Sequence, residues 1–354
     1  MDLLNTTLES IKPVSEKWRA RAAERLQQQA RPRGSLGRLE ELAQRLASIR
    51  HTLRVPTQCK RILTMAGDHG VVAEGVSAYP QEVTGQMVGA FVRRAASINV
   101  LADCVGARVE VVDVGVAADL SPELPIHHKR VRAGTDNMAR GPAMSRDDAI
   151  RSIEVGIEVV NEVAERPAGL DLLGAGDMGI GNTTPSTAIT AVYSGLPVAE
   201  LVGRGTGIDD AGMERKRQAI SRALEVNQPD PADPIDMLAK VGGLEIGGLA
   251  GAVLGAAALG RPVVCDGLIA TAGAVLACEL CPAAKQYLFA GHQSAEAAHQ
   301  ALLARLGLAP LLDLGMRLGE GTGAALAMFL LEAAARALAE IKTFKELGVT
   351  DGEK

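Results

Sequence analysis

Short apolar runs recur along the middle of the chain, and each ends in small or acidic residues. Segments with helical spacing of apolar residues separate them, as in residues 81–102. Strand, small-residue turn and helix in repeated succession are typical of a parallel α/β sheet, and near-continuous apolar strands indicate burial on both faces. The expected strands, each with its following turn, are RILTMAGDHG (61–70), RVEVVDVGV (108–116), LDLLGAGDMG (170–179), VAELVGRGTG (198–207) and RPVVCDGL (261–268).

Both ends of the chain have a helical pattern instead. LGRLEELAQRLASIRHTL (36–53) places leucines at helical spacing, and AALAMFLLEAAARALAEI (324–341) does the same near the other end. We expect these terminal helices to pack together. The predicted division is a large α/β domain, residues 60–325, and a small helical domain made of residues 1–59 plus 326–354.

Two further segments are strongly apolar, IGGLAGAVLGAAALG (246–260) and GLIATAGAVLACEL (267–280). Each is shorter than the roughly 18–20 residues that a membrane-spanning helix needs, and polar residues flank both. We therefore expect buried core helices and no membrane partner.

Composition and charge narrow the class of partner. The 354 residues have a net charge of −5 and only 2% are aromatic, which does not favour binding to nucleic acid or to an anionic membrane surface. Five cysteines in a chain of this length do not indicate a disulfide scaffold. The first residues, MDLLNTTLESIKPVSEKW, lack the apolar segment of a signal peptide, so we expect a cytoplasmic protein.

Polar side chains follow the predicted strands. Asp68 and His69 come at the end of the first, Asp113 of the second, Asp177 of the third, Arg204 and Thr206 of the fourth, and Asp266 of the fifth. Ligands of open α/β sheets bind outside the carboxyl ends of the strands. The pattern therefore predicts the position of the site before it indicates the chemistry.

Residues 174–184, GAGDMGIGNTT, place four glycines in eight positions before a predicted helix. Such a turn exposes backbone N–H groups at a helix start, which attracts an anion, and one compact phosphate is the favoured ligand. Two alternatives stay open. One is a tight turn without a ligand. The other is a dinucleotide, because Gly174, Gly176 and Gly179 match G-x-G-x-x-G and Glu200 could meet a ribose hydroxyl, although Glu200 falls inside its predicted strand.

Glu320 stands between Gly319 and Gly321 in LLDLGMRLGEGTGAALA (311–327). It is either a solvated residue near a helix start or a base in an apolar pocket, where desolvation raises the pKa of a carboxyl group. The residues alone favour the solvated interpretation. They also favour a solvated helix position for Lys216 in ERKRQAI.

No cluster in the sequence has the spacing of a metal site. Cys278 and Cys281 form a single C-x-x-C, and a four-ligand zinc site needs a second one. Asp68 and His69 lack further ligands at H-x-x-x-H spacing, so we expect them to make hydrogen bonds at a strand end. The sequence predicts no metal and no cofactor.

Seven long segments, in order, carry a resemblance to a known family. By them the chain resembles the nicotinate-nucleotide:dimethylbenzimidazole phosphoribosyltransferases, which make the lower-ligand nucleotide of cobalamin. The segments are RPRGSLGRLEELA (31–43), MAGDHGVVAEGVSAYPQEVTGQMV (65–88), GAGDMGIGNTTPSTAI (174–189), GRGTGIDDAG (203–212), CDGLIATAGAVLA (265–277), YLFAGHQSAEAAH (287–299) and LLDLGMRLGEGTGAALA (311–327).

The resemblance implies a reaction and an architecture. Nicotinate mononucleotide and 5,6-dimethylbenzimidazole would give α-ribazole 5'-phosphate and nicotinate, with Glu320 as the general base and no metal or cofactor. The family fold is a doubly wound, three-layer parallel sheet with a small helical domain from both termini, and the family is homodimeric. The alternatives are an acceptor base other than dimethylbenzimidazole, or an NAD-binding oxidoreductase that uses the Gly174–Gly179 loop.

The same resemblance implies roles for individual residues. Asp177 would stand near the reacting ring as a second catalytic residue. The expected phosphate and ribose contacts are Gly176, Gly179, Ile180, Gly181, Asn182, Thr183, Gly205, Lys216 and Ser294. The expected contacts to the acceptor base are Ser77, Tyr79, Gln86, Met87 and Leu318.

Some positions depart from the family pattern. Asp177 replaces a usual glutamate, which is one methylene longer. AFVRRAASIN (90–99) replaces a usual NFxxGGAAIN, so Arg94 and Ala95 stand where two glycines are usual. These departures bear on the choice of acceptor base more than on the class of reaction.

Overall fold

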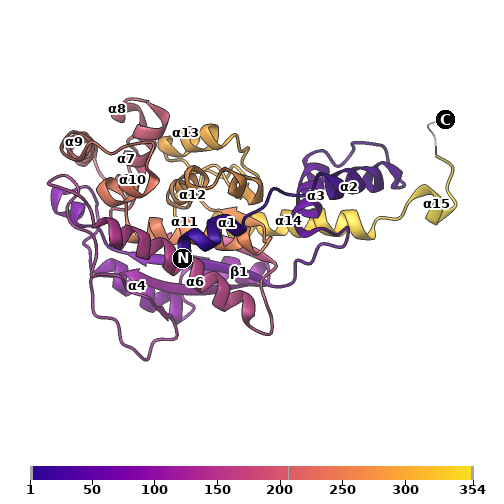
Figure 1. Ribbon diagram of the computed structural model, residues 1–354, viewed down its shortest axis with the longest axis horizontal. Coiled ribbons are helices and arrows are strands. Elements are labelled where there is room, and N and C mark those ends of the chain that lie inside the picture. The colour runs from indigo at the N-terminus through magenta and orange to yellow at the C-terminus, as the bar shows by residue number, and fades with distance from the viewer. Residues whose placement is uncertain (1–2, 206, 352–354) are drawn as a thin grey trace.

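The computed structural model describes residues 3–205 and 207–351 and is an α/β protein (Figure 1). Within these residues, six parallel strands form one sheet in the order β3-β2-β1-β4-β5-β6. The central strands are buried along most of their length, as their apolar sequences predict. The strands are β1 (Lys60–Gly67), β2 (Ala107–Gly115), β3 (His127–His128), β4 (Leu172–Met178), β5 (Val263–Cys265) and β6 (Leu288–Ala290).

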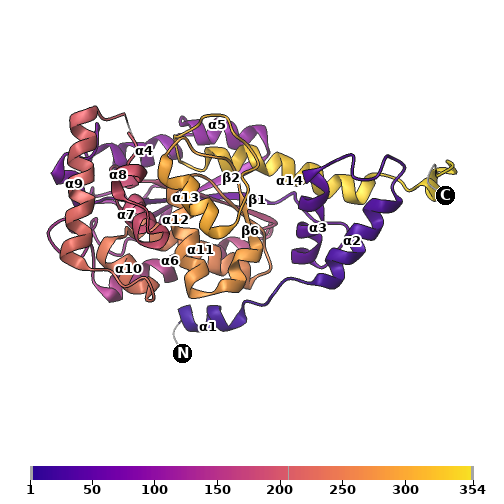
Figure 2. The same ribbon diagram turned by 90° about the horizontal axis from the view of Figure 1, so that it is seen from above.

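Helices cover both faces of the sheet, which confirms the doubly wound, three-layer prediction. In Figure 2, α5 and α14 lie on one side of the strands, while α6 and α11 lie on the other. The α-helices are α1 (Leu3–Ser10), α2 (Glu16–Gln28), α3 (Arg38–Arg50), α4 (Val83–Val92), α5 (Ser97–Cys104), α6 (Arg146–Glu165), α7 (Thr183–Ser194), α8 (Val198–Leu201), α9 (Asp210–Asn227), α10 (Pro234–Val241), α11 (Leu244–Ala258), α12 (Leu268–Leu280), α13 (Ala297–Leu306), α14 (Thr322–Glu340) and α15 (Phe344–Leu347). Two 3-10 helices are η1 (Gly70–Glu74) and η2 (Pro282–Tyr287).

The strand order reverses between β1 and β4. The chain proceeds from β1 outward to β2 and β3, and then returns through α6 to β4 on the other side of β1. In sheets of this kind the crevice at such a switch point, outside the carboxyl ends of the strands, is the usual ligand site. The glycine-rich segment follows β4 and therefore lies at this point.

Helices from both ends of the chain gather beside the sheet. α2 and α3 pack on each other and on α14, and Figures 1 and 2 show this group projecting from the main body. α1 lies apart from them and packs on α6 and α11. The domain boundaries at residues 60 and 325 stay a prediction, and α14 crosses the second boundary because it begins at residue 322.

Two local predictions were wrong. The expected strand in residues 198–207 is replaced by the short helix α8, which begins after Pro197; proline suits the start of a helix, and β5 pairs directly with β4 without an additional strand. The expected helix over residues 81–102 is two helices. α4 ends where Arg94 adopts a left-handed φ of 56°, and Ala96 is extended before α5 begins.

The apolar segments are core helices, as predicted. α11 and α12 are buried along nearly their whole length. α14 is long and apolar enough to cross a membrane, but 56% of its most apolar stretch is buried inside the protein. Burial against the sheet and against α3 and α5 accounts for its composition.

Candidate active site

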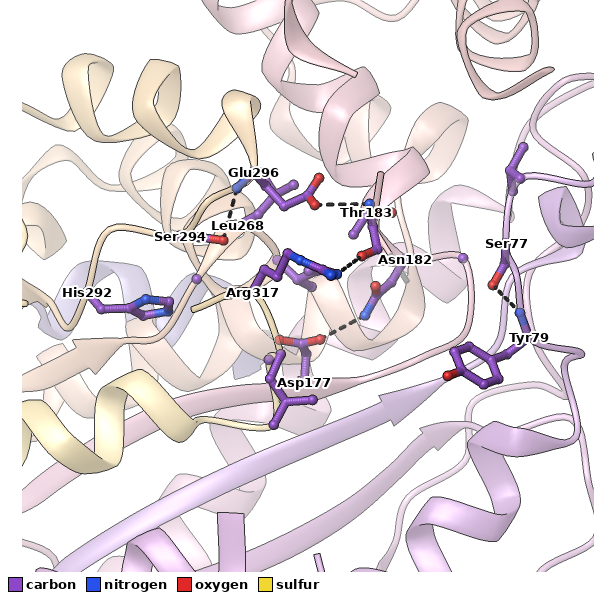
Figure 3. Close-up of a pocket in the computed structure, with 17 residues that line it drawn as sticks. Ser77, Tyr79, Asp177, Asn182, Thr183, Leu268, His292, Ser294, Glu296 and Arg317 are labelled. Atoms are coloured by element: carbon purple, nitrogen blue, oxygen red, sulfur yellow. Dashed lines mark hydrogen bonds between the residues drawn. The ribbon is translucent and has the colours of Figure 1, made fainter. Parts of the chain in front are cut away.

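A cavity of about 250 Å³ opens at the carboxyl edge of the sheet (Figure 3). It is enclosed by the end of β4, the starts of α7 and α12, and four loops. In Figure 3, His292 and Ser294 lie toward one side, Ser77 and Tyr79 toward the other, and Asp177 and Asn182 between them. The lining residues are Val76, Ser77, Tyr79, Asp177, Gly181, Asn182, Thr183, Gly205, Gly267, Leu268, Ile269, His292, Ser294, Glu296, Arg317, Leu318 and Gly319.

The start of α7 faces this cavity. Asn182 is its N-cap residue, yet its side chain does not cap the helix; the Asn182 amide instead donates to Asp177 Oδ2 at 2.8 Å. Gly181, with φ of 87°, brings the chain into the helix. A helix start without its own side-chain cap carries partial positive charge toward the cavity, so the segment suits an anion.

Lys216 lies behind the start of α7 and is fully buried. Its Nζ donates to Thr183 Oγ1 at 2.7 Å and to the Gly203 carbonyl at 3.2 Å. Burial lowers the pKa of this lysine to about 8, although the charge of Glu296 opposes the shift. The prediction of a solvated lysine was therefore wrong, because α9 turns this residue inward.

A loop from α8 to α9 crosses the cavity beside Lys216. The Gly205 N–H donates to Glu296 Oε1 at 3.0 Å, and its carbonyl accepts from Arg317 Nη1 at 2.8 Å. Arg317 therefore holds the 311–321 loop against this segment and places a guanidinium group at the cavity wall. Residue 206 lies outside the described residues.

Ser294 is held by a buried histidine. Its backbone N–H donates to His299 Nδ1 at 2.9 Å, and His299 Nε2 lies 3.0 Å from Thr271 Oγ1. Burial, with a contribution from His292, lowers the pKa of His299 to about 3, so this imidazole stays neutral and accepts at Nδ1. Ser294 Oγ accepts from the Glu296 N–H at 3.3 Å and lies at the cavity wall.

Glu320 lies in the turn that begins α14, directly behind Gly319 of the cavity wall. It is 5% exposed, so the solvated interpretation was wrong. Its Oε2 accepts from the Ile98 N–H at 3.1 Å. Burial and then the charge of Asp266 raise the pKa of this carboxyl group, which is the direction that suits a general base near neutral pH.

Asp177 forms the floor of the cavity at the end of β4. It is buried, and its Oδ1 has no hydrogen-bond partner among the described residues. Burial raises its pKa well above the usual value, and the nearby Asp266 adds to the shift while Asn182 opposes it. The Asp177 carboxyl group is therefore disposed to hold a proton and to donate a hydrogen bond.

Only some of the residues expected to contact the acceptor base lie at the cavity. Ser77, Tyr79 and Leu318 line the cavity, and the last two are about half exposed at its mouth. Gln86 and Met87 lie on α4 outside the lining; Gln86 is exposed and Met87 packs partly against the core. These two residues stay predictions.

The glycines before α7 serve more than one purpose. A side chain at Gly176 would begin 2.5 Å from the Glu320 carbonyl oxygen and the Gly321 nitrogen, so the missing side chain admits the Glu320 turn. Gly179 packs in the same way against the Gly67 carbonyl. Of the four glycines, Gly181 reaches the cavity wall; Gly176, Gly179 and Ile180 lie behind it.

His69, which the sequence offered as a metal ligand, has a buried carboxylate as its partner. His69 Nε2 lies 2.9 Å from Glu245 Oε1, with both side chains buried. The described residues contain no group of three or more side chains suited to a metal ion. Cys278 and Cys281 are free thiols at the end of α12.

Several residues that line the cavity were not predicted from the sequence. Arg317, His292 and Glu296 lie inside motifs of the recognised family, so their presence in those motifs was the available signal. The start of α12 at Gly267 was missed because its segment is almost wholly apolar and suggested only core packing.

Comparisons with known proteins find similar phosphoribosyltransferases. A phosphoribosyltransferase family matches residues 11–349. The nicotinate-nucleotide–dimethylbenzimidazole phosphoribosyltransferase of Syntrophobacter fumaroxidans is 60% identical over 99% of both chains, and that of Geobacter sulfurreducens is 54% identical over the full length of both. The crystal structure of CobT from Thermus thermophilus is 47% identical, with a TM-score of 0.91 over 95% of this chain and all of that one.

The dinucleotide alternative is not supported. Glu200 lies in the exposed part of α8 rather than at the end of a strand, so it does not occupy the position of a ribose-binding carboxylate. None of the relatives described above is named as an oxidoreductase.

Proposed function

The chain belongs to the nicotinate-nucleotide–dimethylbenzimidazole phosphoribosyltransferase family, and we propose that Glu320 is the base with which it transfers the phosphoribosyl group. The donor is nicotinate mononucleotide, the acceptor is 5,6-dimethylbenzimidazole, and the products are α-ribazole 5'-phosphate and nicotinate. This reaction forms the nucleotide that becomes the lower ligand of cobalamin.

One observation carries the assignment of Glu320. A carboxyl group with a raised pKa is buried one residue behind the wall of a cavity that the uncapped start of α7 also lines. The acceptor's N–H proton passes to Glu320 while its other nitrogen bonds to the anomeric carbon. The bond from that carbon to the pyridinium nitrogen breaks, and its electron pair stays with nicotinate, which leaves as a neutral ring.

Little else is needed for this chemistry. Because the leaving group requires no proton, one positioned base and correct orientation of two substrates supply the catalysis. The Asp177 carboxyl group, whose pKa is raised by burial and whose Oδ1 has no hydrogen-bond partner among the described residues, offers a hydrogen bond to a substrate acceptor atom when it holds its proton. We assign it to the reacting centre for this reason.

The nucleotide phosphate is assigned to the start of α7. Gly181, Asn182 and Thr183 supply the helix start, and Lys216 stands behind Thr183. Ser294 and Gly205 line the adjoining wall. Two positive groups, Lys216 and Arg317, thereby approach the same region as the helix dipole, which favours a doubly charged anion.

The acceptor base is assigned to the opposite side of the cavity. Ser77, Tyr79 and Leu318 form its mouth there, and the exposed apolar parts of Tyr79 and Leu318 would be covered by a flat aromatic ring. Gln86 and Met87 from α4 are proposed to complete the subsite when the ring is bound.

The test is an end-point assay with purified protein, nicotinate mononucleotide and dimethylbenzimidazole. The wild type should form α-ribazole phosphate and nicotinate, and Glu320→Gln should lower kcat/KM by about 10²–10⁴-fold, the range for loss of a general base. Glu200→Gln is the matched control, because Glu200 is exposed on α8, and it should retain wild-type activity. Full activity in Glu320→Gln would remove Glu320 from the mechanism.

We also propose a cytoplasmic homodimer. Free cysteines are typical of a reducing compartment, and the family resemblance implies the dimer. Light scattering of the purified protein should give a mass near twice that of the 36.8 kDa chain; a mass near the single value would contradict the dimer.

A further inference from the structure

Asp266 follows β5 and is fully buried. Its carboxylate accepts three backbone N–H groups at the start of α14. They come from Gly321 at 3.1 Å, Gly323 at 2.6 Å and Ala324 at 3.1 Å. The N-cap residue of α14 is Gly321, which has no side chain to accept these N–H groups. The carboxylate of Asp266, at the end of β5, caps the helix instead.

The residue before that cap is Glu320, and its backbone is strained. Glu320 has a φ of 64°, between Gly319 at 87° and Gly321 at 97°. A residue with a side chain rarely adopts this conformation and keeps it only when its surroundings hold it there. The Glu320 N–H donates to the Asp177 carbonyl, and the Glu320 carbonyl accepts from Thr64 Oγ1, both at 3.1 Å.

The bond to the Asp177 carbonyl fixes the peptide before Glu320 at β4. The peptide after it is held at both ends, its carbonyl by Thr64 of β1 and its N–H, which belongs to Gly321, by Asp266 after β5. The Glu320 side chain leaves the main chain between these two anchors. Its direction toward the Ile98 N–H therefore depends on both.

Asp266 also acts on Glu320 through its charge. Asp177 faces Glu320 from β4, Asp266 faces it from the end of β5, and α5 contributes the Ile98 amide. His292 stands behind Asp266, with Nε2 3.4 Å from Oδ1. Burial alone would lower the pKa of His292, but the hydrogen bond and the charge of Asp266 raise it. The negative charge of Asp266 adds to burial in raising the pKa of Glu320.

We propose that Asp266 is a positioning residue of the transfer reaction, which holds Glu320 through the first turn of α14 and acts on it through its charge. The inference rests on the proposed function of Glu320 as the base. Asp266 is not assigned a contact with either substrate.

The test compares Asp266→Asn with the wild type in kcat/KM measured across pH. An asparagine presents one N–H₂ group to the three amides and removes the charge, so it loosens the turn and lowers the pKa of Glu320. We expect kcat/KM to fall about 10–100-fold, in line with a small misplacement of a catalytic group, with a nearly unchanged KM for the mononucleotide. The acidic limb of the profile should move to lower pH, because Glu320 is active when deprotonated and would now lose its proton more easily.

Asp113→Asn is the matched control. Asp113 is also a buried carboxylate, near the carboxyl end of β2, and it accepts the Val116 N–H at 2.8 Å, so this variant measures the general effect of such a change. Its acidic limb should stay at the wild-type pH. Because all assays use the same two substrates, a shift of the acidic limb reflects a change in the protein and not in the substrates. An unmoved limb in Asp266→Asn, or wild-type kcat/KM, would overturn the inference.

Asp266→Glu provides a second test if Asp266→Asn does not fold. It keeps the charge but pushes the turn by one methylene, so kcat/KM should fall while the acidic limb stays in place; wild-type kcat/KM would overturn the positioning role. Failure of the proposed function is a different result, since full activity in Glu320→Gln removes the base itself. If Glu320→Gln is inactive but Asp266→Asn has the pH profile of the wild type, the positioning role of Asp266 is rejected and the role of Glu320 as the base stands.

Discussion

Two helices begin at the carboxyl edge of the sheet and use their first turns differently. The first turn of α14 is occupied from within, because Asp266 accepts three of its amides. The first turn of α7 has no side-chain cap and borders the cavity. One helix dipole thus stabilises a carboxylate of the protein, and the other is left for a ligand.

The difference accounts for how the proposed base and the proposed anion site coexist at one small cavity. A negative charge behind Glu320 favours its protonated form, so the group is a stronger base when it has lost its proton. A positive lysine behind α7 favours a bound anion. Exchanging the two surroundings would weaken both functions, because the base would become weaker and the phosphate would be repelled.

The contact between β4 and the turn that begins α14 gives the largest expected effect. In Gly176→Ala the new methyl group would overlap the Glu320 carbonyl and the Gly321 nitrogen, at 2.5 Å from each. We expect the free energy of unfolding to fall by about 1–3 kcal/mol and kcat/KM to fall about 100-fold as Glu320 shifts.

Gly141→Ala is the control for that change, since a side chain at Gly141 meets nothing within 4 Å. Thermal melting and the end-point assay measure both quantities. A Gly176→Ala protein with wild-type melting and rate would show that the β4 glycine does not set the position of the base.

The lysine behind α7 should give a smaller, more selective effect. Lys216→Met keeps the buried stem but removes the charge, so the KM for nicotinate mononucleotide should rise about 10–100-fold, as expected for loss of a charged hydrogen bond of about 1.5–3 kcal/mol. The kcat at saturation should change less. Lys285→Met, at an exposed lysine, should match the wild type, and a fall in kcat with constant KM would place Lys216 outside the phosphate subsite.

The pH dependence of donor binding should give the smallest effect. The pKa of Lys216 is about 8 in the free protein, so raising the pH through 8 removes its charge and weakens binding of the mononucleotide. Calorimetric titration should show a constant affinity near pH 7 and a decline above pH 8 that is absent in Lys216→Met. Constant wild-type affinity up to pH 9.5 would mean that the lysine charge is not used.

The α/β class predicted from the sequence is confirmed, and a cavity lies at the strand ends, where the sequence predicted the site. The anion-binding role of the segment after β4 stays a prediction. These predictions follow from local chemistry, because apolar runs form buried strands and glycines before a helix expose its amides. The strand expected in residues 198–207 failed for the opposite reason. Its short apolar run has no neighbouring strand to pair with, and the pairing of β4 with β5 is set by the whole sheet.

The sequence by itself also determined the family, since long motifs in a fixed order were present. Only the tertiary structure decided that Glu320 and Lys216 are buried rather than solvated, because burial depends on what packs from other parts of the chain. It also brought Asp266 from the end of β5 to the amides of α14, some 55 residues further along the chain. A pKa is set by such distant neighbours through burial and charge, and no local pattern of residues contains them.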